Sequence, residues 1–411
     1  MCSYNNIMDL SYELLCILFF IFNINTATCF SKFKTVTQSS GYSDSIFLDS
    51  LQLLQSYNYS SEKHVVVTED GYKLNIFRIP RKGSPVLLVH GIGDSSDSWL
   101  VLGPKHSLAY QLADAGFDVW LFNARGNRYC KEHIKNISQK LFWDFSYEEI
   151  GSYDLPATVN YILSETRYSK VSYVGFSQGS TTFFVMCSMR PEFNKKINHA
   201  ILLAPVAWLK HTKYPLIDFF SKSLNILTWI AETQQVYEAF PFNEKLNLYH
   251  ASVCDTLSPV RMLCELELFV NFGLQKLSNL LPEKLPVITS HIPAGTSSKV
   301  FLHFIQGYST QRFQRYDYGV SKNLEVYSST FPPVYDVSLV SAPVTLVSSE
   351  VDWFSDVEDV SILKRKLNSV AKSVHINGSL QFTHLEFVYG ARVNSVINKP
   401  VLNILEGLRK K

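Results

Sequence analysis

The sequence predicts an α/β fold in which a mostly parallel sheet carries helices on both faces. Short, continuous apolar runs recur along the chain, as expected for strands that are buried on both sides. Amphipathic stretches of helical period lie between several of these runs, and such alternation is typical of a parallel sheet. Hydrophobic residues make up 46% of the 411 residues, so the chain can bury a large core and is not disordered.

The strands can be placed in chain order. Residues 64–67 and 74–79 flank a turn at 68–72 that contains an Asp-Gly pair, which predicts a β-hairpin. This hairpin precedes the parallel part of the sheet. The buried strands follow at residues 85–89, 117–122, 171–174, 200–203 and 344–347.

The spacing of the strands breaks once, between residues 205 and 335. This segment lacks a comparable series of apolar strands and is rich in Leu, Phe, Tyr and Lys, which predicts a largely helical insertion. We therefore expect residues 29–204 and 336–411 to form the two parts of one core that the insertion interrupts.

The N-terminus predicts export. Residues 14–22 form an uninterrupted apolar run followed by small residues at 26–28, which is the length of a secretory signal rather than of a membrane span. We expect residues 1–28 to be a cleaved signal peptide. Because the residues before the apolar run include two acids and no Lys or Arg, an uncleaved membrane anchor is the alternative.

Three N-x-S/T triplets are glycosylation candidates. They begin at Asn58, Asn136 and Asn377. Such triplets also arise by chance in a chain of this length, so they support the export reading only in combination with the signal peptide.

The charge balance and the cysteine pattern exclude two classes of function. With 38 Lys and Arg against 36 Asp and Glu, the net charge is +2 and no long basic run occurs, so nucleic acid is not an expected partner. The seven cysteines include no C-x-x-C and no Cys/His cluster at zinc spacing, so no metal site is expected.

Three of the cysteines permit a structural interpretation. In an oxidising compartment Cys254 and Cys264 could close a short loop through a disulfide, or they could remain two unpaired thiols. Cys187 lies in an apolar stretch and is expected to act as a small buried hydrophobic residue.

The strongest chemical feature is a G-x-S-x-G pentapeptide at residues 175–179. A strand precedes it and an apolar helical stretch follows, which is the strand, tight turn and helix of a nucleophile elbow. The two glycines serve a physical purpose, because the serine sits in a strained conformation where neighbouring chains pack closely. Ser177 is therefore the candidate nucleophile.

A serine nucleophile needs a base, and the base needs an orienting carboxylate. In chain order they follow the serine, each after a strand, with the acid before the histidine. Asp352 and His384 fit this order and position. Other side chains in the same stretch compete for these roles, as acids Glu350, Asp356 and Asp359 and as base His375.

Two backbone amides are also needed to stabilise an oxyanion. One normally belongs to the residue after the nucleophile, here Gln178, and the other to a loop after an early strand, here Ile92. A simple tight turn would explain Gly91 and Gly93 equally well. It explains less about His90, whose imidazole could brace the loop.

Several longer strings of the sequence match, in order, those of one known family. They lie at residues 68–72, 107–109, 112–120, 123–127, 142–157, 291–297 and 384–387. From about residue 60 to the C-terminus, the chain resembles the gastric and lysosomal acid lipase family. The resemblance implies an α/β-hydrolase core with a mostly parallel sheet, a helical cap or lid at residues 205–335, and hydrolysis of neutral-lipid esters without a cofactor.

The resemblance also implies roles for individual residues. The family's nucleophile, acid and base correspond to Ser177, Asp352 and His384, and its oxyanion donors correspond to Ile92 and Gln178. The family's cap disulfide corresponds to Cys254 and Cys264.

This sequence departs from the family in the neighbourhood of the site. Phe176 stands where the family usually has His, Ile92 where it has Leu, and Ser349-Glu350-Val351 where a Gly-Gly pair precedes the acid. No departure removes a catalytic atom. The departures leave the substrate preference open.

We therefore expect a secreted or lysosomal lipase that hydrolyses acyl esters of neutral lipids, either triacylglycerol or cholesteryl ester. Its partner would be a lipid ester at the surface of a droplet, micelle or lipoprotein, and no stable protein partner is implied. A catalytically silent lipid-binding protein and a peptidase or short-chain carboxylesterase on the same core are the alternatives.

Overall fold

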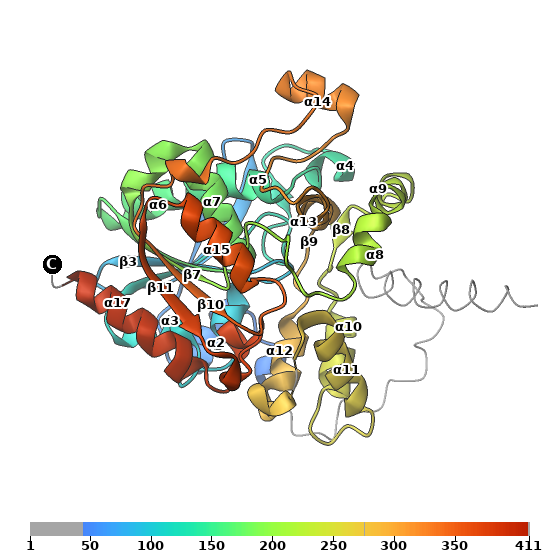
Figure 1. Ribbon diagram of the computed structural model, residues 1–411. Helices are drawn as coiled ribbons and strands as arrows, with labels where there is room; N and C mark the ends of the chain where they lie inside the picture. The colour runs from blue at the N-terminus through green and yellow to red at the C-terminus, as the bar shows by residue number, and fades with distance from the viewer. Residues whose placement is uncertain (1–43, 275, 410–411) are drawn as a thin grey trace, which may run out of the picture.

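The computed structural model describes residues 44–274 and 276–409. The signal peptide expected at residues 1–28 lies outside the described residues. A central sheet has helices on either face, and a second group of helices gathers beyond one end of the sheet (Figure 1). The fold class expected from the sequence is therefore confirmed.

The main sheet begins with the expected hairpin and becomes parallel. Strands β1 (Glu62–Val67) and β2 (Tyr72–Ile79) are antiparallel, and β2 is also antiparallel to β4 (Asp118–Leu121). The other neighbouring pairs across the sheet, from β4 and β3 to β10 and β11, are parallel. The order across the sheet is β1, β2, β4, β3 (Pro85–Val89), β6 (Val171–Phe176), β7 (Ile197–Leu203), β10 (Val344–Ser349) and β11 (Val370–Ile376), with β5 (Glu132–His133) paired to β2.

Strand β3 illustrates why the runs are continuously apolar. Side chains alternate between the two faces of a strand, and in β3 both faces are covered. Val86 and Leu88 belong to one hydrophobic cluster, whereas Leu87 and Val89 belong to another. The first cluster includes side chains of α2 (Ser50–Ser56), α3 (Leu108–Asp114) and α17 (Lys399–Arg409), and the second includes side chains of α6 (Leu155–Thr166), α7 (Gln178–Met189) and α15 (Val357–Lys366).

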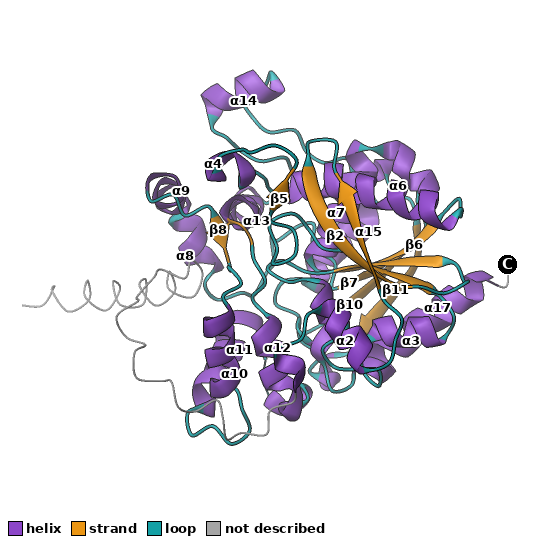
Figure 2. Ribbon diagram, turned by 180° about the vertical axis from the view of Figure 1, so that it is seen from behind, coloured by secondary structure: helices purple, strands orange, loops and turns teal. Residues whose placement is uncertain are grey.

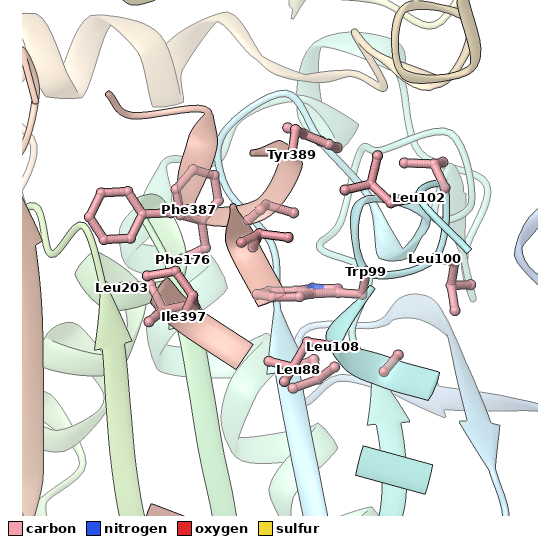
Figure 3. Close-up of a cluster of buried hydrophobic side chains, with 14 of the residues drawn as sticks. Leu88, Trp99, Leu100, Leu102, Leu108, Phe176, Leu203, Phe387, Tyr389 and Ile397 are labelled. Atoms are coloured by element: carbon pink, nitrogen blue, oxygen red, sulfur yellow. The ribbon is translucent and has the colours of Figure 1, made fainter. Parts of the chain in front are cut away.

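A short helix near the C-terminus is anchored in the first cluster. This helix, α16 (Glu386–Tyr389), contributes the buried residues Phe387, Val388 and Tyr389. Figure 3 shows Tyr389 in the same group of side chains as Trp99 and Leu88. The end of the chain is thereby fixed to the middle of the sheet.

Between β7 and β10 the described residues add no strand to the main sheet. Instead, strands β8 (Glu238–Ala239) and β9 (Thr296–Ser297) form a separate antiparallel pair, which the sequence did not predict. The helices of this segment are α8 (Ile217–Lys222), α9 (Leu224–Thr233), α10 (Glu244–Val253), α11 (Arg261–Phe272), α12 (Leu285–His291), α13 (Ser298–Thr310) and α14 (Val320–Tyr327). Helix α14 and the α10–α12 group lie at opposite ends of the molecule in both views (Figure 1 and Figure 2).

Residues 44–274 and 276–409 contain no helix that is both long and apolar enough to cross a membrane.

A buried ion network fastens the loop after β4 to the rest of the core. Arg125, whose side chain is 1% exposed, donates to Asp154 through Nε at 2.7 Å and to Asp70 through both terminal nitrogens at 2.6 and 2.8 Å. Its guanidinium also lies 3.9 Å from the ring centre of Tyr72. Because Asp70 belongs to the hairpin turn and Asp154 precedes α6, one side chain joins three segments that are far apart in sequence.

Removal of one partner from this network is expected to destabilise the fold strongly. Asp154→Ala leaves a buried guanidinium with part of its charge uncompensated, so we expect the free energy of unfolding to fall by about 3–5 kcal/mol in urea denaturation. Lys73→Ala is the matched control, because the Lys73–Glu132 ion pair is exposed and should contribute below about 1 kcal/mol. Equal effects of the two substitutions would contradict the structural role of Arg125.

Candidate active site

Ser177 occupies the sharp turn between β6 and α7. Its φ and ψ angles are 52° and −115°, a conformation that residues with a side chain rarely adopt. Its backbone N–H donates to the carbonyl of Leu203 on the neighbouring strand at 3.0 Å. The turn is therefore held in its strained shape by the sheet itself.

The glycines around this turn are explained by close packing. A Cβ atom on Gly175 would lie 2.7 Å from the carbonyl oxygen of Gly179, and one on Gly179 would lie 2.5 Å from the carbonyl oxygen of Val89. Both distances are far below van der Waals contact. Any other residue at either position would push the serine out of place.

The structure brings the expected acid, base and nucleophile together. His384 Nε2 lies 2.8 Å from the Ser177 hydroxyl oxygen, although the two residues are 207 positions apart. On the other side of the ring, His384 Nδ1 lies 2.8 and 3.0 Å from the carboxylate oxygens of Asp352. The imidazole can therefore donate to the carboxylate and accept from the hydroxyl, which is the arrangement that activates a serine.

Asp352 is fixed as a hydrogen-bond acceptor. Its side chain is fully buried, and its Oδ1 accepts from the backbone N–H groups of Phe354 at 2.9 Å and Ser355 at 3.1 Å. These bonds determine the direction of the carboxylate. The carboxylate in turn determines which ring nitrogen of His384 carries the proton.

The competing side chains are engaged elsewhere. Glu350 and His375 pair with each other at 3.2 Å on the surface. Asp356 accepts from the backbone N–H of Glu358 at the start of α15, and Asp359 binds His211. In the described part of the chain, none of the four competitors forms a hydrogen bond to Ser177 or His384.

The two expected oxyanion donors lie on either side of Ser177. Gln178 is the first residue of α7, so its N–H has no acceptor within the helix. A Cβ on Gly91 would lie 3.5 Å from the Ser177 Cβ, which places the loop of Ile92 beside the serine. Among the described residues, no group accepts a hydrogen bond from either amide.

His90 braces the loop that carries Ile92. Its Nδ1 donates to the carbonyl of Gly91 at 2.7 Å, and its Nε2 accepts from the backbone N–H of Ala124 at 3.2 Å. Burial lowers the pKa of His90 to about 4, so the ring is neutral and can make both bonds at once.

Three supporting residues were not identified from the sequence. The rings of Phe176 and Phe354 each lie 5.0 Å from the His384 ring, between centres, and they limit how the imidazole can turn. The Glu386 carboxylate accepts from the backbone N–H of Thr383 at 2.6 Å and from its hydroxyl at 2.9 Å, which shapes the turn that carries His384. The sequence signal that could have identified these residues is that each lies within two positions of a catalytic candidate.

The helical segment between β7 and β10 covers the site. Phe240 packs against Gly93 of the early loop, and the backbone N–H of Ala294 donates to the Gly93 carbonyl at 2.7 Å. At the other side, a Cβ on Gly273 would lie 2.7 Å from the ring of Trp353, which follows Asp352. Ser177 itself is 7% exposed.

The cysteines and the glycosylation candidates lie away from the catalytic residues. A disulfide joins Cys254, directly after α10, to Cys264 in the first turn of α11, with a Cα–Cα distance of 5.2 Å. Cys187 is buried in the second hydrophobic cluster with its thiol unpaired. The asparagines of all three triplets are exposed, namely Asn58, Asn136 and Asn377.

Comparison with family models and solved structures agrees with this architecture. The model described as the alpha/beta hydrolase fold matches residues 84–388, and one described as a partial alpha/beta-hydrolase lipase region matches residues 51–103. Two solved structures share the fold at 15% identity: DcsB in complex with its substrate analogue (TM-score 0.52, covering 85% of this chain and 99% of that chain) and the alpha/beta hydrolase GrgF from Penicillium sp. sh18 (TM-score 0.50, covering 85% and 98%).

Individual relatives identify the family more narrowly than the fold does. Lipase 1 of Drosophila melanogaster is 38% identical over 86% of this chain and 79% of its own length. The gastric triacylglycerol lipase of Rattus norvegicus is 36% identical over 82% and 86%, and the human lysosomal acid lipase/cholesteryl ester hydrolase is 34% identical over 86% and 90%. The family resemblance found in the sequence is thereby confirmed, and the chain belongs to the gastric and lysosomal acid lipase family of α/β-hydrolase-fold serine ester hydrolases.

Proposed function

We propose that this protein is a secreted or lysosomal lipase that hydrolyses acyl esters of neutral lipids through a covalent intermediate on Ser177. The observation that carries the proposal is the continuous hydrogen-bonded chain from Ser177 through His384 to Asp352. A silent lipid-binding protein would not need this chain or the strained turn that presents the hydroxyl.

The first half of the cycle forms the acyl-enzyme. His384 takes the proton from Ser177 as its oxygen attacks the ester carbonyl, and the charge of Asp352 stabilises the resulting imidazolium. The N–H groups of Ile92 and Gln178 donate to the oxyanion of the tetrahedral intermediate. His384 then gives its proton to the departing alcohol, and the acyl group remains on Ser177.

The second half repeats these steps with water. His384 takes a proton from the water molecule as its oxygen attacks the acyl-enzyme, and the same two amides stabilise the second oxyanion. Collapse of this intermediate breaks the bond to Ser177, which recovers its proton from His384. Every proton transfer uses Ser177, His384 or water, so the proposed cycle requires no cofactor.

Two observations support a lipid ester as the substrate. Relatives at 36% and 34% identity are named as a triacylglycerol lipase and as an acid lipase and cholesteryl ester hydrolase. The segment that covers the site also exposes an apolar surface. Its exposed residues are Ile226, Trp229, Leu257, Val260, Met262, Leu263, Leu266 and Phe269, from α9, α11 and the loop before α11.

We propose that this apolar surface makes residues 205–335 a cap whose α9–α11 part opens against a lipid surface. The side chains of Met262, Leu263, Leu266 and Phe269 are 42–75% exposed, although α11 also buries Cys264 and Leu268. Apolar residues on both faces of one surface helix indicate that its outer face has a second environment. The contact between Gly273 and Trp353 links movement of α11 to the loop of the catalytic acid.

Export would suit the observed surface chemistry. A disulfide forms stably in an oxidising compartment, and the three exposed asparagines are accessible for glycosylation.

Ser177→Ala is expected to abolish ester hydrolysis while the protein stays folded. Loss of the nucleophile should lower kcat by roughly 10⁵–10⁶-fold on a soluble ester such as p-nitrophenyl butyrate, with an unchanged circular dichroism spectrum. Ser188→Ala is the matched control, because Ser188 is also buried on α7 but its hydroxyl donates to the backbone carbonyls of Phe184 and Val185 in its own helix. Substantial turnover by the purified Ser177 variant would refute the mechanism.

Substitution of the acid tests which carboxylate orients the histidine. Asp352→Asn keeps the size of the side chain but favours the wrong tautomer of His384, so kcat should fall by roughly 10⁴-fold. Glu350→Gln changes an exposed carboxylate that binds His375, and it should change kcat by less than about twofold. A large loss in the Glu350 variant with activity retained in the Asp352 variant would reverse the assignment.

A charge on α11 is expected to slow hydrolysis at a lipid surface but not hydrolysis of a soluble ester. Leu263→Glu should lower the rate on emulsified triolein roughly fivefold or more, because one leucine can no longer enter the lipid, while turnover of soluble p-nitrophenyl butyrate stays within twofold. Leu324→Glu is the control, because Leu324 on α14 is equally exposed, at 50% against 52%, and lies at the opposite end of the molecule (Figure 1). Equal losses in the two variants would count against a lid at α11.

A further inference from the structure

A side-chain hydrogen bond joins the helix that follows His384 to the loop that carries Ile92. Helix α16 begins two residues after His384 and ends at Tyr389. The Tyr389 hydroxyl donates to Asp94 Oδ2 at 2.8 Å, and Asp94 lies two residues after Ile92 in the chain. Figure 3 shows Tyr389 within the buried cluster, so this contact is made in the interior.

Both ends of this contact are rigid. The other carboxylate oxygen of Asp94 accepts from the backbone N–H of Ser95 at 2.7 Å, so the side chain is fixed to its own loop. At the opposite end of α16, Glu386 binds Thr383, which directly precedes His384. A displacement of Tyr389 would therefore be transmitted in both directions.

The loop of residues 90–97 is held both from the core and from the insertion. From the core, the backbone N–H of Ala124 donates to His90, and Asn123 accepts from the backbone N–H of Ser96. The Gly93 carbonyl accepts from Ala294, and Asp97 binds His291 at 2.9 Å. Ala294 and His291 both belong to the segment that we propose as the cap. The Asp94–Tyr389 contact is likewise made by the core, so it stays in place if the cap moves.

We infer that Asp94 and Tyr389 are positioning residues, whose hydrogen bond fixes the Ile92 amide relative to the Ser177–His384 pair. The inference rests on the proposed function. An oxyanion donor is effective at about 2.7–3.1 Å from the oxyanion, so a small shift of the loop should reduce transition-state stabilisation without changing substrate binding.

The environment of Asp94 adds a pH dependence. Burial raises the pKa of Asp94 to about 7, although the Ser95 amide and the Tyr389 hydroxyl favour its charged form. The other charged groups that face it are Asp97, which raises this pKa, and His291, which lowers it. The carboxyl gains its negative charge as the pH rises through about 7, two residues from the proposed oxyanion donor Ile92, so we expect kcat to decrease over that range.

Tyr389→Phe tests the contact directly. It removes one hydroxyl from a buried ring, and we expect kcat on p-nitrophenyl butyrate to fall roughly tenfold while KM changes by less than twofold. Tyr110→Phe is the matched control, because Tyr110 is buried in the same cluster and its hydroxyl donates only to the Leu53 carbonyl. It should leave kcat unchanged.

Variants of Asp94 give a second, independent measurement. In Asp94→Asn the amide retains the contact, because the Tyr389 hydroxyl can accept as well as donate. The kcat of this variant at pH 6 should therefore stay within threefold of wild type. The decrease in kcat above pH 7 should disappear in this variant. Asp94→Ala should lower kcat as Tyr389→Phe does, and the double variant should lose no more than either single variant.

The inference is overturned if Tyr389→Phe and Tyr110→Phe have the same kcat, or if Asp94→Ala matches Asp94→Asn at pH 6. A fluorophosphonate probe on the wild-type protein separates this failure from failure of the proposed function. Labelling of Ser177 together with unchanged kcat in the Tyr389 variant overturns the positioning role alone, whereas an unlabelled wild-type protein overturns both.

Discussion

The site depends on one constraint, the strained backbone of Ser177 at the junction of β6 and α7. A positive φ at a serine is unfavourable on its own, and here it persists because the Leu203 carbonyl and the closely packed glycines leave the chain no alternative path. The strain turns the hydroxyl toward His384 and places the N–H of Gln178 at the free end of α7. The proposed nucleophile and one proposed oxyanion donor thus belong to a single turn.

The remaining groups are brought to this turn by the parallel sheet. Because parallel strands end at the same edge, the loops after β3, β6 and β10 lie along one edge of the sheet, and they carry Ile92, Ser177 and Asp352. The insertion contacts this edge at Gly93 and Trp353. A low-dielectric enclosure strengthens every hydrogen bond in the site, but it also requires a way for an apolar substrate to enter.

Much of this arrangement could be predicted from local signals. The hairpin, the buried strands and the G-x-S-x-G turn each have a short-range cause, either an Asp-Gly turn, a continuous apolar run or a pair of glycines that nothing larger can replace. Two-residue strands such as β8 and β9 leave no such signal, because they depend on the packing of distant segments. The choice of Asp352 over Glu350 and Asp356 likewise remained open until the hydrogen-bond partners of all three were known.

The sequence by itself determined the fold class, the family and the identity of the serine, since these follow from patterns within a few residues of one another or from long matching strings. Only the tertiary structure decided which acid faces His384, how Phe176 and Phe354 confine the imidazole, and that Tyr389 reaches Asp94 across 295 positions of the chain. The physical reason is that a hydrogen bond depends on distance and direction in space, and the chain order of its two partners contains neither.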